Sequence, residues 1–112
     1  MWIFTSKGFL SIVEDKWCKK DLVVRSRFCG HLEKIFGRKI KVKIMEGSDY
    51  EYRTTLPREE VQRVIAKLAS NIHYTNFKGE LGKQCGRGDF DYLYKSYLTY
   101  GVLKGEQGEW EI

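Results

Sequence analysis

The sequence is poor in the residues that cross-link small secreted proteins. Its 112 residues include only three cysteines, Cys18, Cys29 and Cys85, an odd number with no regular spacing. This pattern argues against a disulfide framework and for a reducing compartment, so we expect a cytoplasmic protein. No stretch approaches the roughly 18 consecutive apolar residues of a membrane-spanning helix. The apolar start, Met1–Thr5, has no basic residues before it, unlike a signal peptide. We therefore expect no membrane partner.

Acidic residues are also in deficit, since 15 Asp and Glu oppose 20 Lys and Arg, which gives a net charge of +5. This balance favours an anionic partner without naming one. With 42% hydrophobic and 31% charged residues, the composition is typical of a folded globular domain and excludes a disordered chain. We predict a single domain over residues 1–105 and an acidic tail over 106–112, in which Glu106, Glu109 and Glu111 surround Trp110.

Motifs for metals, cofactors and catalysis are missing. No Cys-x-x-Cys or His-x-x-x-His pair occurs, so we predict no metal site. The glycine-rich segment 79–88 is no phosphate-binding P-loop, because Gln84 follows Lys83 where a magnesium-binding Ser or Thr is needed. We therefore predict no cofactor and no catalytic residue, and favour a non-enzymatic protein. The possible ligands and nucleophiles do not have the spacing of a metal site, and Cys29-Gly30-His31 is an unusual ligand pair. These possible ligands and nucleophiles are Cys18, Cys29, His31, His73 and Cys85.

Hydrophobic periodicity predicts five strands and three helices. The strands are expected at 2–5, 8–14, 22–26, 40–45 and 50–56, and the helices at 27–36, 57–72 and 90–103, with a loop over 73–88. The order ββ-β-α-β-β-α-α predicts an α+β fold, a single-domain antiparallel sheet of about five strands with two to three helices on one face. Such a sheet commonly leaves its other face to solvent. The helix at 57–72 should pack through an apolar stripe: Val61, Val64, Ile65, Leu68 and Ile72.

Cations alternate with apolar residues along three of the predicted strands. Alternate residues of a strand point to the same side, so one sheet face should be basic. Arginine suits phosphate because its planar fork donates two parallel hydrogen bonds. The basic residues are either the ordinary solvated side of a sheet or a binding surface for RNA, DNA or an acidic protein. The predicted anion-binding or nucleic-acid-binding set is Arg25, Arg27, Lys41, Lys43 and Arg53.

A polar and aromatic cluster follows the strongest helix. It has two interpretations, a core anchor in which Tyr74 and Phe77 are buried, or the rim of a pocket beside Arg25 and Arg53. The second interpretation gives an alternative function, a small-ligand-binding protein or an enzyme. The predicted rim residues are Asp49, Tyr50, His73, Tyr74, Asn76 and Lys78.

Several segments together resemble a family of short bacterial and phage-like proteins of uncharacterised function. The resemblance covers roughly residues 1–80 and brings no activity with it. Together with the basic face, the resemblance leads us to expect a small binding module. In one variant of this hypothesis, the module is a phage or mobile-element protein that regulates or inhibits a host complex. The segments are Met1–Thr5 followed by Gly8-Phe9, Val24-Arg25-Ser26-Arg27, Asp49-Tyr50-Glu51-Tyr52-Arg53, and Asn71 through Lys78.

Overall fold

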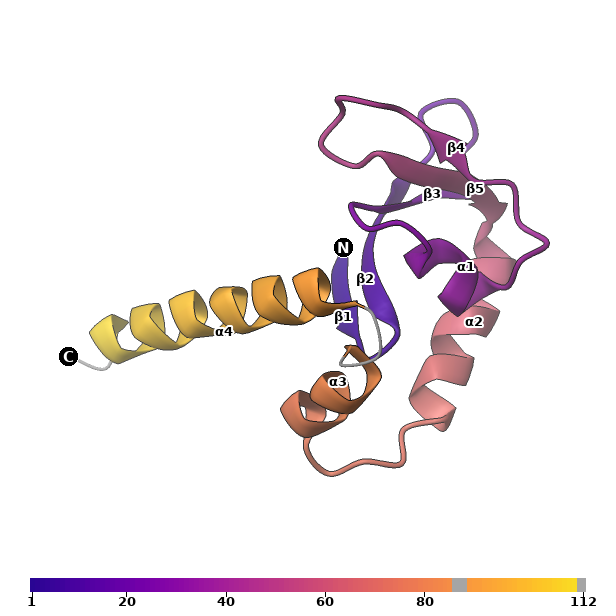
Figure 1. Cartoon of the computed structure of the whole chain (residues 1–112). Coiled ribbons are helices and arrows are strands. Elements are labelled where there is room, and N and C mark those ends of the chain that lie inside the picture. The colour runs from indigo at the N-terminus through magenta and orange to yellow at the C-terminus, as the bar shows by residue number, and fades with distance from the viewer. Residues whose placement is uncertain (86–88, 111–112) are drawn as a thin grey trace.

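A computed structural model describes residues 1–85 and 89–110, with side chains described through residue 105. The fold is α+β, as the sequence predicts, and Figure 1 shows a twisted five-stranded antiparallel sheet accompanied by four helices. The strand order is β1-β2-β3-β5-β4. The strands are β1 (Trp2–Thr5), β2 (Gly8–Glu14), β3 (Asp21–Ser26), β4 (Lys43–Ile44) and β5 (Tyr52–Pro57). The helices are α1 (His31–Phe36), α2 (Arg58–Ser70), α3 (Phe77–Cys85) and α4 (Phe90–Trp110).

The main core lies between the sheet and the helices α1 and α2, which Figure 1 shows on one side of the strands. Its fully buried members alternate along the strands, as expected for the inner face of a sheet. Val61 of α2 packs into this core, and Val64 is also buried. Ile65 packs at the edge, whereas Ile72 lies beyond the end of α2 and is 56% exposed. The predicted stripe is therefore correct for Val61, Val64 and Ile65, whereas Leu68 is half-buried and lines a pocket, and Ile72 lies outside the core.

The predicted loop over 73–88 is wrong in its middle, because residues 77–85 form α3. The glycines at 79 and 82 favoured a loop in the prediction, although Phe77, Leu81 and Cys85 recur every four residues, which is a helical spacing. Leu81 and Cys85 are buried. The Asn76 side chain accepts a hydrogen bond from the backbone N–H of Gly79 at 3.2 Å, which satisfies one of the free donors at the start of the helix.

Other element boundaries also differ from prediction. The strand expected at 40–45 is only β4, although Ile40 and Val42 before it still pack against the main core. The first helix begins at His31 rather than at 27, and Gly37 ends it with φ of 96°, a conformation that favours glycine. The helix expected to end near residue 103 continues to Trp110, and beyond residue 105 only its backbone is described. The predicted acidic tail, 106–112, lies outside the described side chains.

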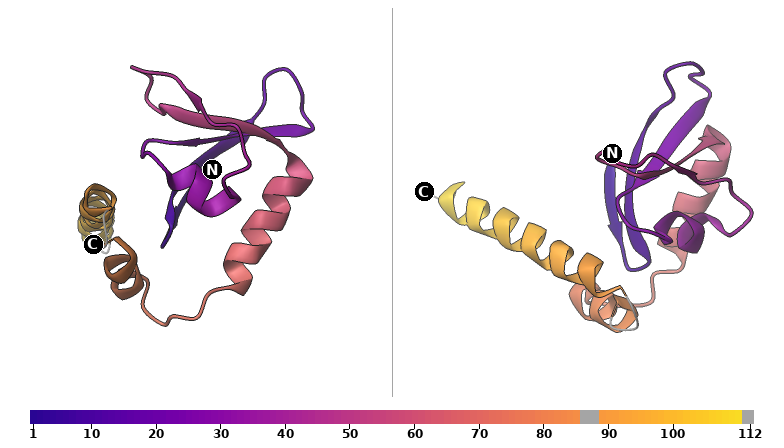
Figure 2. Two further views of the ribbon diagram at one scale, coloured as in Figure 1. Left: turned by 45° about the vertical axis from the view of Figure 1, so that its right-hand side comes forward. Right: turned by 45° about the horizontal axis from the view of Figure 1, so that its top comes forward.

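A second cluster forms where α3 and the start of α4 meet the sheet. Its buried residues come from four parts of the chain: Phe9, Tyr50, Leu81, Cys85 and Tyr92. This cluster lies on the strand face opposite the main core, because Phe9 alternates with Leu10 of that core along β2. From there α4 extends away from the sheet, as both views in Figure 2 show. The second cluster thus covers one end of the sheet face that the sequence predicts to be open.

Candidate nucleic-acid interface

One row of residues crosses all five strands on this second face. The pairing register sets Trp2 opposite Ser11, Ser11 opposite Arg25, Arg25 opposite Arg53, and Arg53 opposite Lys43. Residues directly opposite one another in neighbouring strands share a face of the sheet. At a spacing of about 4.8 Å between strands, the row is about 19 Å long. We call Arg25, Arg53 and Lys43 the basic row.

The two arginines of the basic row are held by hydrogen bonds inside the chain. Arg25 donates from Nη2 to the Ser11 hydroxyl at 2.8 Å, and Arg53 donates from Nη2 to the Tyr50 carbonyl at 3.1 Å. The Arg25 guanidinium also lies over the Tyr50 ring, 4.4 Å from its centroid. Such contacts fix a guanidinium in place without neutralising it.

Among the described side chains, the basic row has no counter-charge. Within the part of the chain that the structure describes, no carboxylate lies within ion-pair distance of Arg25, Arg53 or Lys43. Like charges directly opposite each other in a sheet are destabilising. The Nε atoms of Arg25 and Arg53 are buried, and they too have no hydrogen-bond partner among the described residues. This stretch of the sheet therefore has a concentration of positive charge that the rest of the described protein does not neutralise.

The remaining predicted basic residues lie around this row. Arg27 follows β3 and pairs with Asp49, with 3.1 Å between nitrogen and oxygen, while its guanidinium lies 5.0 Å from the Tyr50 ring centroid. Both partners are well exposed, so the pair contributes little and leaves Arg27 available. Lys41 is exposed in the segment before β4. The expectation that Arg25 and Arg53 face solvent freely is wrong, since both are half-buried.

Aromatic side chains share the sheet face with the basic row. Trp2, at the far end of the row, is 68% exposed, and Phe4 on the same strand is 38% exposed. The Trp2 ring meets Phe9 edge to face, with 6.3 Å between centroids. One side of the indole is thus supported while much of it remains accessible. Accessible aromatic rings beside cations are what a sheet needs to stack unpaired bases and hold their phosphates.

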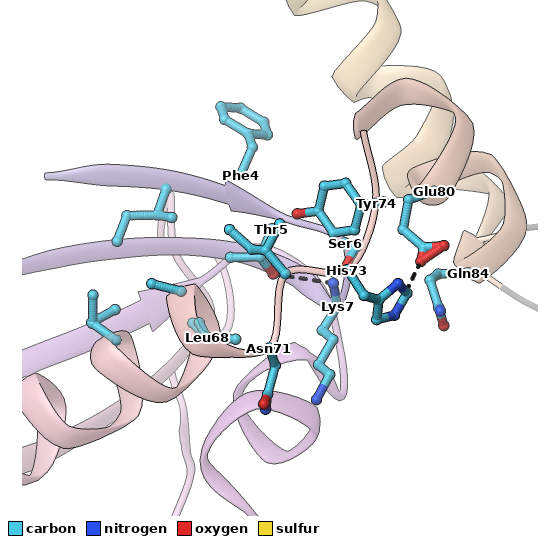
Figure 3. A pocket seen from close by; sticks show the side chains of 14 residues that line it. Phe4, Thr5, Ser6, Lys7, Leu68, Asn71, His73, Tyr74, Glu80 and Gln84 are labelled. Carbon is cyan, nitrogen blue, oxygen red and sulfur yellow. Dashed lines mark hydrogen bonds and ion pairs between the residues drawn. The ribbon is translucent and has the colours of Figure 1, made fainter. Parts of the chain in front are cut away.

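The predicted pocket rim does not assemble as a unit. His73 and Tyr74 line an apolar pocket of about 380 Å³ between β1, the end of α2 and α3, and Figure 3 shows both side chains there with Phe4 and Leu68. Its lining includes none of Arg25, Arg53, Asp49 or Tyr50. In the same pocket His73 lies 3.9 Å from the buried carboxylate of Glu80.

The other rim residues have separate roles. Asp49 and Tyr50 lie with Arg27 and Arg25, so they belong to the basic face. Asn76 caps α3 and lines an adjacent cleft of about 310 Å³. The Lys78 ammonium lies 4.7 Å from the ring centroid of Tyr100 on α4. Of the two interpretations of the cluster, Phe77 fits the core anchor because it packs against the second core cluster.

A buried pair that the sequence did not reveal joins His31 to Asp89. The His31 ring is fully buried. Its Nδ1 accepts a hydrogen bond from the Phe9 backbone N–H at 3.0 Å, so the ring proton sits on Nε2, which donates to the Asp89 carboxylate. Lys34 lies 3.6 Å from the same carboxylate. Because both ring nitrogens are occupied, His31 has none left to act as a general base, and the pair connects the start of α4 to the sheet.

His31 should make stability depend on pH. Burial lowers the pKa of its imidazole below the usual 6.5, and the hydrogen bond that the ring donates to Asp89 only partly opposes this. The unfolded chain therefore binds more protons, so stability is complete above pH 6.5 and falls as the pH drops below it, by up to about 1.4 kcal/mol per pH unit. Urea unfolding between pH 5 and 8 measures this dependence. His31→Gln, which keeps one acceptor and one donor, should flatten it; an equally steep dependence in this variant would assign the effect to another group.

Within residues 1–85 and 89–105, whose side chains the structure describes, no three side chains of His, Cys, Asp or Glu gather into a possible metal site. Within residues 1–85 and 89–110, no helix combines the length and apolarity needed to cross a membrane.

Comparison with known proteins adds no assignment: no family model, no curated protein and no solved structure matches the chain. The site must be interpreted from its geometry alone.

Proposed function

We propose that this protein binds single-stranded nucleic acid across the second face of its sheet. The phosphates contact Arg25, Arg53 and Lys43 of the basic row, and an unpaired base stacks on Trp2. The observation that carries the proposal is the direct cross-strand pairing of Arg25 with Arg53 and of Arg53 with Lys43, with no carboxylate in ion-pair distance among the described residues. A phosphate backbone supplies the missing negative charge, and arginine forks match its oxygens.

Single strands are favoured over duplexes by the position of the aromatic residue. Trp2 lies in the same row as the cations, four strands from Lys43, and its ring can stack only on a base that is not paired inside a helix. We place this activity in the cytoplasm, where the three cysteines, free in the structure, would remain reduced.

Binding is tested by fluorescence anisotropy with labelled mixed-sequence single-stranded RNA, single-stranded DNA and the corresponding duplexes. The proposal predicts binding of at least one single strand and weaker binding of its duplex. Tighter binding of the duplex would contradict the stacking role of Trp2. Failure of every nucleic acid to bind would overturn the proposal and favour an acidic protein surface as the partner.

Removing the indole of Trp2 should weaken single-strand binding. Stacking on an aromatic side chain contributes about 1–3 kcal/mol per base, so Trp2→Ala should lower affinity about tenfold or more. The matched control is Trp17→Ala, because Trp17 is 91% exposed in the turn between β2 and β3 and lies outside the row. Equal losses in the two variants, measured by anisotropy at one salt concentration, would show that Trp2 has no particular role.

A further inference from the structure

An apolar stripe runs along the solvent side of α4. At 100° per residue, its members fall within about 140° of the helix circumference. The opposite side contains Tyr92 and Ser96, which are buried against the rest of the protein. The apolar stripe consists of Phe90, Tyr94, Tyr97, Leu98, Gly101, Val102 and Gly105.

Most of the stripe is accessible. Tyr97 at its edge touches α3, where its hydroxyl donates a hydrogen bond to the Lys78 carbonyl at 3.2 Å while 44% of the residue stays exposed. Phe90 is 72% exposed, Leu98 53% and Val102 62%. Figures 1 and 2 show why, since α4 extends away from the sheet and no other element runs alongside its far half. Monomeric soluble proteins rarely present so large a continuous apolar patch, and such patches commonly mark an interaction surface.

Large and small side chains are separated along the stripe. Phe90, Tyr94 and Tyr97 occupy the first half, whereas Gly101 and Gly105 occupy the second. A glycine inside a helix costs about 1 kcal/mol relative to alanine. A Cβ added at either glycine would meet no other atom of the protein within 4 Å, so contacts in the described monomer do not explain the choice of glycine.

We propose that two copies of this protein pair through this stripe with α4 antiparallel to α4 of the second copy. The two-fold axis passes between Tyr97 and Leu98, which then face each other across it. In this register Phe90 of one copy lies against Gly105 of the other, and Tyr94 lies against Gly101. Both pairs fit at once because the two aromatic residues and the two glycines have the same spacing of four residues.

A parallel pair would lack this fit. It would set Phe90 against Phe90 and leave the two glycine segments facing each other across a gap, which close packing disfavours. The antiparallel pair also brings the positive end of each helix dipole near the negative end of the other.

The surface available meets the lower limit for a specific dimer. Five large apolar side chains of the stripe are 44–72% exposed: Phe90, Tyr94, Tyr97, Leu98 and Val102. With aromatic side chains of about 150–250 Å² each, the stripe offers roughly 500 Å² per copy, or about 1,000 Å² for the pair. An interface of this size is at the low end for specific association, so we expect a dissociation constant in the micromolar range.

Sedimentation velocity over a concentration series tests the dimer with the full chain. The wild type should change from monomer to dimer, and Leu98→Glu should remain monomeric because it places a charge at the centre of the interface. Thr99→Glu is the matched control, since Thr99 lies on the other side of the helix and is exposed. A wild type that stays monomeric at about 100 μM, where an interface of this size should form, overturns the proposal. Binding of the monomer to lipid vesicles would then assign the stripe to a membrane surface.

The glycine gives a test that separates pairing from folding. Gly101→Leu should raise or preserve the melting temperature measured on dilute monomer, because leucine favours the helix and its Cβ would meet no other atom within 4 Å. The same change should weaken the dimer at least tenfold, because it fills the space for Tyr94 of the second copy. Unchanged dimerisation would exclude this register.

Cysteine cross-linking tests the antiparallel direction. In a Cys29→Ser background, Tyr94→Cys combined with Gly101→Cys should form disulfide-linked dimers under mild oxidation, because these positions face each other. Phe90→Cys alone should not cross-link, since its equivalents lie at opposite ends of an antiparallel pair. Efficient cross-linking through Phe90→Cys alone would show that the pair is parallel.

Discussion

Replacing Gly8 by alanine is expected to lower the free energy of unfolding by about 3 kcal/mol, the upper range for overpacking a closed core. A Cβ at this position would lie 2.6 Å from Cγ of the His31 ring, far inside van der Waals contact. The His31 ring cannot move away from the added Cβ. Phe28 stacks on it at 4.9 Å and Tyr92 contacts it edge-on at 4.6 Å between centroids, while both of its nitrogens are held by hydrogen bonds.

Gly79→Ala is the matched control. Its added Cβ would come no closer than 3.6 Å to the Asn76 side chain, and it lies in α3, where alanine is favoured by up to about 1 kcal/mol. Urea denaturation should therefore move the midpoint down for Gly8→Ala and leave it equal or higher for Gly79→Ala. An unchanged midpoint in Gly8→Ala would mean that His31 can leave its position freely, and the role given to the His31 and Asp89 pair would be wrong.

The double variant Arg25→Gln and Arg53→Gln is expected to bind single-stranded nucleic acid about 25-fold more weakly at 0.1 M salt. Each phosphate contact on a single strand changes affinity by about 0.7 log units per tenfold change in salt, so two contacts give a loss of this size. Stability should stay the same or rise, because the change removes two like charges that face each other across β3 and β5. Glutamine also keeps an amide donor for Ser11 and for the Tyr50 carbonyl.

The control for net charge is the double variant Lys16→Gln and Lys39→Gln. Both lysines are exposed and lie outside the strands, and the variant loses the same two charges. Anisotropy titrations of the two double variants should separate them by about an order of magnitude in affinity, the margin expected for two specific phosphate contacts. Similar losses would mean that overall charge, rather than the basic row, attracts the nucleic acid.

Local patterns in the sequence predict much of this fold and part of its surface. The alternation of apolar and basic residues placed Arg25 and Arg53 on one side of their strands, and the structure agrees. It could not show that they are direct neighbours, because β3 pairs with β5 across an intervening helix and strand. Pairing between strands distant in sequence depends on the packing of the whole sheet, which residue spacing does not encode.

Contacts between distant residues were missed for the same reason. His31 and Asp89 are 58 residues apart, and nothing in the sequence near either residue indicates the other. Asp89 directly precedes the first residue of α4, a position where aspartate often caps a helix, but its side chain bonds to His31. Apolar spacing predicts the helix at 90–103, yet spacing alone does not tell which side of α4 meets its own domain.

Tyr50 departs from the alternating pattern of the neighbouring strand residues. Tyr50, Tyr52 and Leu56 are spaced by even numbers of residues, so an extended strand would put all three on one side, and Tyr52 and Leu56 do pack against the main core. Tyr50 precedes β5, whose first residue is Tyr52, so the alternation does not extend to it. Its ring instead lies near Phe9, with centroids 6.5 Å apart, beneath the guanidinium groups of Arg25 and Arg27.

A salt titration of wild-type binding to a short single-stranded oligonucleotide tests the proposed function most directly. Three phosphate contacts, to Arg25, Arg53 and Lys43, should make the logarithm of the association constant fall by about 2 units per tenfold increase in salt. The slope should shrink to roughly one third when both arginines are replaced by glutamine, because only one of the three contacts remains. Binding that does not depend on salt, or a slope that the double variant leaves unchanged, would contradict the assignment of the basic row to nucleic-acid phosphates.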